Sequence, residues 1–222
     1  MKPKLITMLT YNDETVQDAI DIFDQCSDLP CDYWGFKDIG LSTQEMKRLV
    51  NKMNDYGKNT VLEVVSLTEQ ECMNGAKLAV DCGFDYLMGT IYYSSISNFL
   101  KDKPIKYFPF CGNVSGHPSV ITGTIQDIVE GGENLEKLGV DGFDLLAYRY
   151  IGDCEELARS ILRSVKVPVV IAGSIDSYQR LDKVEELNPW AFTMGSALFN
   201  KKFTDKGEFR DQLKQVLEYI LD

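Results

Sequence analysis

The sequence predicts an α/β fold, a single (β/α)₈ TIM barrel of eight parallel strands with outer helices. Three observations lead to this fold class. Short apolar runs alternate with amphipathic segments along all 222 residues. The eight resulting units average about 28 residues, which is enough for a strand, a helix and their connections. The sequence also has no linker, low-complexity tract or charge run that would divide it, so we expect one domain over 1–222.

The apolar runs are the predicted strands. Most are rich in Val, Ile, Leu, Phe and Tyr with little polar alternation, as strands covered on both faces are. An open doubly wound sheet is the competing architecture, but it usually has five or six strands. The predicted strands span 5–10, 33–39, 59–66, 85–90, 105–112, 142–149, 168–174 and 190–199.

The segments between the strands repeat apolar residues at intervals of three and four, which predicts amphipathic helices. Ser42 and Thr124 are each followed three residues later by an acidic residue, Glu45 and Asp127, the pattern of a helix N-terminus. The segment 92–103 has the weakest helical pattern. The predicted helices span 15–26, 41–57, 67–83, 92–103, 124–139, 153–165, 177–188 and 207–222.

The composition excludes several classes of partner. Lys and Arg total 23 and Asp and Glu total 34, so the formal net charge is −11. A chain this acidic repels nucleic acid and anionic membranes. The apolar run near the start is too short for a signal sequence, and no run approaches the roughly 18 residues of a membrane span. We therefore expect a cytoplasmic protein with no membrane contact.

The cysteines and the histidine predict neither a metal site nor a cofactor. None of the 6 cysteines forms a C-x-x-C pair, and a single histidine leaves no Cys/His zinc pattern. A disulfide framework does not suit a chain of this length and apolar content. We expect free thiols, most of them buried.

Two Gly-Ser pairs stand at the ends of the last two predicted strands. Gly173–Ser174 follows "PVVIA", and Gly195–Ser196 follows "WAFTM". In a (β/α)₈ barrel the active site lies at the C-terminal ends of the strands, with a phosphate site often built after strands 7 and 8. Small residues, hydroxyl groups and helix N-termini there suit an anion. The competing explanation is that small residues ease tight turns.

These same residues resemble the phosphate-binding TIM barrels, the ribulose-phosphate-binding barrel group. That group shows Gly-Gly-Ile after strand 7 and Gly-Ser/Arg-Ala after strand 8. The chain has Gly173-Ser174-Ile175 and Gly195-Ser196-Ala197 at these places. The resemblance implies the barrel fold, a phosphate site and often a dimer, so a homodimer is one expected state. It does not imply a reaction, because the group carries out many.

Departures from individual members exclude some of those reactions. The chain lacks the Asp-x-Lys-x-x-Asp motif of the decarboxylases and hexulose-phosphate synthases. Its first strand lacks the Asp or Cys of the histidine- and tryptophan-pathway isomerases. One histidine cannot supply the metal ligands of the usual ribulose-phosphate epimerases.

Lys37 and Glu63 are the predicted catalytic pair. Side chains alternate along a strand, so Lys37 shares the barrel interior with Gly35 if Trp34 and Phe36 face the helices. Glu63 lies at a similar depth on the neighbouring strand, and its side chain is also expected to point into the barrel. Strands lie about 4.8 Å apart, so the two side chains can meet. The pair serves either as a structural salt bridge or as an acid and base.

Four further residues are candidates for substrate binding or catalysis. Tyr148 and Arg149 end the sixth predicted strand and are expected to hold a substrate carboxylate or hydroxyl. Asp144 lies early in that predicted strand, so it is expected to be structural. The long loop after the fifth strand carries Asn113, a binding candidate, and His117, a catalytic candidate.

We therefore expect an enzyme that acts on a small phosphorylated sugar or related metabolite by proton transfer next to a carbonyl, as an isomerase, epimerase or lyase. Two alternatives stay open. One is a Schiff-base aldolase acting through Lys37. The other is a non-catalytic barrel that binds a phosphorylated ligand.

Overall fold

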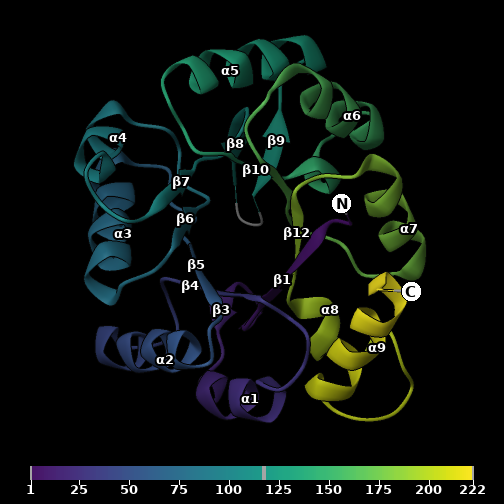
Figure 1. Ribbon diagram of the computed structural model, residues 1–222. Coiled ribbons are helices and arrows are strands. Elements are labelled where there is room, and N and C mark those ends of the chain that lie inside the picture. Colours follow the sequence, from purple (N-terminus) through teal and green to yellow (C-terminus); the bar gives the residue numbers. More distant parts are fainter. Residues whose placement is uncertain (1, 117–118, 222) are drawn as a thin grey trace.

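A computed structural model describes residues 2–116 and 119–221, and its centre is an eight-stranded parallel sheet (Figure 1). The strand order is β10-β11-β12-β1-β4-β5-β6-β7. A parallel bridge between Phe110 and Asp144 links the two ends of this order, so the sheet closes into the predicted (β/α)₈ barrel. The strands are β1 (Lys4–Met8), β4 (Tyr33–Lys37), β5 (Asn59–Glu63), β6 (Tyr86–Met88), β7 (Lys106–Phe108), β10 (Phe143–Leu145), β11 (Val169–Ile171) and β12 (Ala191–Met194).

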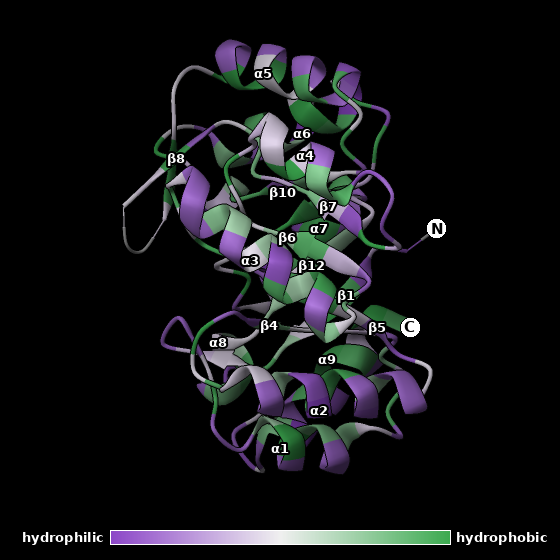
Figure 2. Cartoon of the chain, turned by 90° about the vertical axis from the view of Figure 1, so that its left-hand side faces the viewer, coloured by the Kyte–Doolittle hydropathy of each residue, from purple (hydrophilic) through white to green (hydrophobic). Residues whose placement is uncertain are grey.

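Helices surround the sheet and turn hydrophobic residues towards it, with hydrophilic residues outside (Figure 2). A helix follows each barrel strand, including the weakly patterned segment 92–103. The helices are α1 (Ala19–Cys26), α2 (Thr43–Asp55), α3 (Glu69–Cys82), α4 (Ser94–Leu100), α5 (Ile125–Lys137), the 3₁₀ turn η1 (Ala147–Arg149), α6 (Cys154–Ser164), α7 (Tyr178–Leu187), α8 (Ser196–Phe199) and α9 (Phe209–Leu221).

The predicted capping residues do start their helices. The Ser42 hydroxyl accepts a hydrogen bond from the Glu45 N–H, and the Glu45 carboxylate accepts one from the Ser42 N–H at 2.8 Å. Thr124 and Asp127 make the same reciprocal pair at α5. Each pair satisfies two N–H groups that a helix start leaves unbonded.

Two antiparallel hairpins were not expected. The first joins β2 (Thr10–Tyr11) and β3 (Glu14–Thr15) through Asn12 and Asp13, which have φ of 49° and 65°. Asn and Asp tolerate this left-handed conformation in tight turns. The predicted helix 15–26 therefore begins only at Ala19. The second joins β8 (Asn113–Ser115) and β9 (Val120–Thr122), within the predicted long loop.

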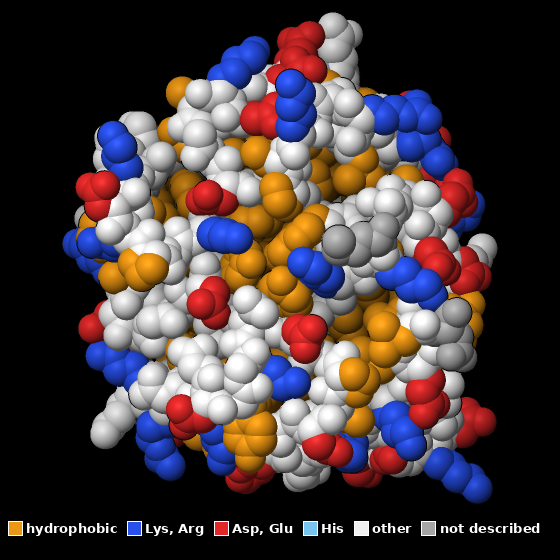
Figure 3. Space-filling view, viewed as in Figure 1, with side chains coloured by type: hydrophobic (Ala, Val, Ile, Leu, Met, Phe, Trp, Pro, Cys, Tyr) orange, Lys and Arg blue, Asp and Glu red, His pale blue; other side chains and the backbone are white. Residues whose placement is uncertain are grey.

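Aromatic side chains fill the barrel interior at the N-terminal ends of the strands. We call this cluster the aromatic floor. Its members are Tyr33, Tyr86, Phe108 and Trp190, and the ring centroids of contacting members lie 5.5–6.0 Å apart. Lys4 Nζ lies 4.7 Å from the Trp190 ring centre. Figure 3 shows this face, with hydrophobic side chains over its centre and charged side chains around them. The interior is therefore closed at this end.

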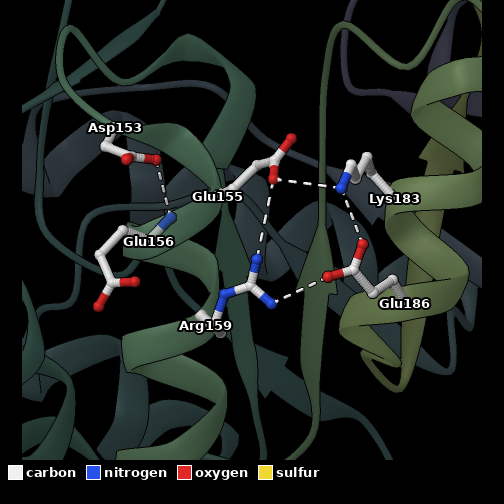
Figure 4. Close-up of polar contacts among 6 residues, drawn as sticks. All are labelled: Asp153, Glu155, Glu156, Arg159, Lys183 and Glu186. Atoms are coloured by element: carbon white, nitrogen blue, oxygen red, sulfur yellow. Dashed lines mark hydrogen bonds and ion pairs between the residues drawn. The ribbon is translucent and has the colours of Figure 1, made fainter.

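An ion-pair network joins α6 to α7 on the outside of the barrel (Figure 4). Arg159 lies between Glu155 and Glu186, at 3.8 and 3.1 Å. Lys183 bridges the same two carboxylates from the other helix, at 3.7 and 2.8 Å. All four side chains are at least one-third exposed, so the network adds little to stability but fixes how these neighbouring helices align.

Within the described residues, no helix is both long and apolar enough to pass through a membrane. This agrees with the short apolar runs of the sequence.

Candidate functional site

A cavity of about 230 Å³ opens at the C-terminal ends of the strands, opposite the aromatic floor. Figure 2 shows β8 on this side of the molecule and the two chain ends on the other. Both Gly-Ser pairs, Lys37, Glu63 and Arg149 line the cavity, so residues far apart in the sequence converge as predicted. The other lining residues are Met8, Thr10, Asp13, Leu146, Ile175, Asp176, Thr193, Met194, Ala197, Asn200 and Lys202.

The first Gly-Ser pair forms a left-handed turn after β11. Gly173 has φ of 78° and Ser174 of 59°, and the Gly173 N–H donates to Thr193 Oγ1 on β12 at 3.4 Å. A Cβ on Gly173 would lie only 2.7 Å from Arg149 Nε, so glycine leaves room for the guanidinium. Arg180, on α7, donates to the Ser174 carbonyl and fixes the turn from outside.

The second pair connects β12 directly to α8. A Cβ on Gly195 would meet the Thr10 carbonyl oxygen at 2.9 Å, which explains why the chain has glycine there. Ser196 is exposed and starts α8, which makes the predicted strand 190–199 too long at its C-terminal end. The hydrogen bonds of the described chain leave the main-chain N–H groups of Ser174 and Ser196 without an acceptor. Both pairs can therefore donate to an anion in the cavity.

Lys37 lies in the barrel interior, as its parity predicted, and is 6% exposed. Trp34 and Phe36 pack into the outer core, between strands and helices. The Lys37 ammonium forms an ion pair with Asp13, with Nζ 2.8 Å from Oδ1. Asp13 belongs to the β2–β3 turn, in the short connection that the sequence analysis left between the first predicted strand and the first predicted helix. The hairpin thus brings a carboxylate over the cavity.

Glu63 is the direct neighbour of Lys37 across β4 and β5, which confirms the similar depth predicted for them. Leu62 and Val64 join the outer core, so Glu63 faces inward. However, within the described residues Lys37 forms an ion pair with Asp13 and none with Glu63, so the salt-bridge alternative is wrong and the acid–base alternative stays a prediction. Glu63 is half-buried and faces the cavity, where a ligand could reach it.

The two candidates that follow β10, Tyr148 and Arg149, lie in different surroundings. Arg149 faces the cavity beside Gly173. Tyr148 packs against the outer core under Arg180, whose guanidinium lies 4.9 Å from the ring centre, and it is not among the cavity-lining residues. Burial raises the pKa of Tyr148 to about 12. The chain turns at η1, which sends these adjacent side chains in different directions.

Asp144 is not the remote structural residue that the sequence suggested. β10 ends at Leu145, so Asp144 lies near the C-terminal end of its strand. It is fully buried in the interior, and neither carboxylate oxygen has a hydrogen-bond partner among the described residues. Its burial and the Glu63 carboxylate both raise the pKa of Asp144 well above the ordinary value, while Arg149 and Lys37 act in the opposite direction.

Of the two candidates on the loop after β7, only Asn113 lies among the described residues. Asn113 begins the β8–β9 hairpin with an exposed side chain, and it is not a lining residue. Its binding role stays a prediction. His117 lies outside the described residues, so its catalytic role stays a prediction too. No cluster of His, Cys, Asp and Glu suited to a metal ion occurs in residues 2–116 and 119–221.

The fold places the chain among the (β/α)₈ barrels. No family model matches the sequence, and no curated protein matches it. The matching solved structures include the orotidine 5'-phosphate decarboxylase from Pyrococcus horikoshii OT3, with a TM-score of 0.71 and 12% identity over 98% of this chain and 99% of that one.

Two further solved structures share this architecture. The tryptophan synthase complex from Pyrococcus furiosus contains a chain with a TM-score of 0.69 and 15% identity, covering 100% of this chain and 99% of that one. The N-acetylmannosamine-6-phosphate 2-epimerase from Clostridium perfringens gives a TM-score of 0.66 and 14% identity, covering 92% and 93%. These are ribulose-phosphate-binding barrels, so the resemblance seen at the Gly-Ser pairs is confirmed for the fold.

Proposed function

We propose that the protein is an enzyme that acts on a small phosphorylated sugar or related metabolite by proton transfer next to a carbonyl. The observation that carries this proposal is a single cavity with two chemically distinct sides. One side has the Gly-Ser pairs of β11 and β12, and the other has Lys37 and Glu63. A ligand held by its phosphate at the first side would present its carbon chain to the second.

The charges around the cavity favour a phosphorylated ligand despite the net charge of −11. The lining carries as many cations as anions, so it is not dominated by negative charge: Lys37, Arg149 and Lys202 with Asp13, Glu63 and Asp176. Charges elsewhere on the surface are screened beyond roughly 8–10 Å. Arg149 lies against Gly173, where its guanidinium and the Ser174 N–H can bind the same phosphate.

Glu63 is the group we assign to proton transfer, because it reaches the cavity and its register neighbour on β4 is a cation. Lys37 would stabilise negative charge that develops on the carbonyl oxygen as the proton leaves. Its ion pair with Asp13 favours this role over Schiff-base formation, since only a neutral amine attacks a carbonyl.

Phosphate binding is tested with inorganic phosphate and a panel of phosphorylated sugars by calorimetry. Ser196→Asp places a carboxylate beside the expected phosphate and should weaken binding at least about tenfold, or about 1.4 kcal/mol. Asn98→Asp adds the same charge on exposed α4 and should leave binding unchanged. Gly195→Asp is unsuitable, because its Cβ would collide with the Thr10 carbonyl. Equal binding by both variants would contradict the phosphate site.

Proton transfer is tested on each bound ligand by NMR in deuterated water. The wild-type protein should exchange a hydrogen next to the carbonyl, and Glu63→Gln should lose this exchange while still binding phosphate. Borohydride added with the ligand should leave Lys37 unmodified. A covalent adduct at Lys37 would instead support the aldolase, and phosphate binding without any exchange would support a non-catalytic barrel.

A further inference from the structure

The Asp144 side chain is buried without a structural explanation. Its main chain is satisfied: the N–H donates to the Pro109 carbonyl at 3.0 Å, and the carbonyl accepts from the Cys111 N–H at 3.1 Å. Its two carboxylate oxygens have no partner in the described part of the chain. A buried carboxylate without hydrogen bonds is destabilising unless it binds a proton. Barrel closure needs only the backbone of this residue, so its carboxyl group needs another explanation.

Gly89, directly after β6, shows what the Asp144 carboxyl group faces. A Cβ built on Gly89 would lie 3.1 Å from Glu63 Cγ and 3.4 Å from Asp144 Oδ2. Glu63 Cγ and Asp144 Oδ2 therefore lie no farther apart than these two distances added together. Gly89 also has φ of 83°, where glycine is favoured. The absence of a side chain there leaves the space between the Glu63 side chain and the Asp144 carboxyl group unfilled by Gly89.

The charged groups that act on Asp144 come from three neighbouring elements. Glu63 on β5 is negative, whereas Lys37 on β4 and Arg149 on η1 are positive. Lys37 is already paired with Asp13, which reduces the charge it offers to the interior. The negative charge of Glu63 and the burial of Asp144 both favour the protonated form of Asp144.

We propose that Glu63 and Asp144 form a carboxyl pair that holds one proton at neutral pH, with Asp144 as its protonated member and Glu63 as its ionised member facing the cavity. Asp144 has no cavity contact, so it is a positioning residue and acts through Glu63. Its role in turnover rests on the proposed function, in which Glu63 is the base. The pair then holds one proton before the reaction, two after Glu63 takes a proton from the ligand, and one again after that proton returns.

The proton itself is measured in the ligand-free protein, by NMR of aspartate labelled with ¹³C at the carboxyl carbon, from about pH 4 to about pH 9. One resonance should remain protonated at neutral pH and disappear in Asp144→Asn. Glu63→Gln removes the neighbouring charge and should move the titration of this resonance down by about one pH unit or more. Asp38→Asn is the control, since Asp38 is also near Glu63 and its pKa is raised, mainly by burial; it should leave the Asp144 resonance in place.

The proposed carboxyl pair would be contradicted by an Asp144 resonance that titrates in the ordinary range of aspartate. It would also be contradicted if the titration of this resonance did not move in Glu63→Gln. If Asp144→Asn does not fold, Asp144→Glu removes the residue from the labelled set and makes the same assignment. No ligand is present in this titration, so its result is independent of the phosphate and exchange experiments. A protein that binds no phosphate can still show the shared proton, and a phosphate-binding enzyme can fail to show it.

Discussion

Lys37 and Asp13 form an ion pair, with Nζ and Oδ1 2.8 Å apart, although 24 residues separate them in the chain. The lysine belongs to the barrel and the aspartate to the β2–β3 turn. The Lys37 side chain is 8% exposed and that of Asp13 is 52% exposed. One end of the pair is therefore fixed in the interior, while the other reaches it from the cavity rim.

Asp13→Asn should cost less than about 1 kcal/mol of unfolding free energy, because water already screens the exposed carboxylate. The measurement is urea unfolding at low and high salt, and the loss should shrink as salt is added. Glu14→Gln removes an exposed charge from the same hairpin and serves as the control. A loss of several kcal/mol would mean that the pair holds the barrel together and is not mainly a part of the cavity.

Gly142→Ala should destabilise the barrel by about 1–3 kcal/mol through overpacking. A Cβ there would lie 2.2 Å from the Phe108 ring, in the aromatic floor. Gly131 provides the matched comparison, because it lies within α5 and a Cβ there meets nothing within 4 Å. Gly131→Ala should stabilise the protein by about 0.5–1 kcal/mol, since alanine favours the helix. Thermal unfolding of both variants gives the comparison, and equal shifts would contradict the packing around Gly142.

The buried thiols should make the protein less stable in alkali. Burial raises the pKa of Cys26 and of Cys111 from 9.0 to about 12. A raised pKa favours the neutral thiol in the folded state, so this stability is present below about pH 9 and is lost as pH rises towards 12. Cys111→Ala should reduce the alkaline slope of the unfolding free energy. An unaltered slope in Cys111→Ala would contradict the assignment.

Local patterns predicted the barrel well because each strand and helix depends mainly on its own residues. Alternation placed Lys37 and Glu63 inside, and Ser42 and Thr124 start their helices. The partner of Lys37 could not be predicted in this way. Asp13 reaches the cavity because a two-residue turn reverses the chain after β2. The residues that follow, from Thr15 on, have helical spacing, so nothing in the sequence indicated a second strand there.

The position predicted for Asp144 is wrong because the predicted strand 142–149 is longer than β10. If the strand ran over 142–149, Asp144 would lie near the start, far from the cavity. The strand ends at Leu145, and η1 turns the chain immediately afterwards. The burial of its carboxyl group beside Glu63 is a property of closure between β7 and β10, which no single segment encodes.

The aromatic floor has a consequence for the path of protons. Tyr86, Phe108 and Trp190 close the barrel at one end, so the cavity mouth is the route by which a proton on Glu63 would reach bulk solvent. A bound ligand would occupy that same passage. A hydrogen taken from one carbon of the ligand would then return in part to the same molecule before it reaches water, so solvent deuterium should enter the ligand more slowly than hydrogen is transferred within it.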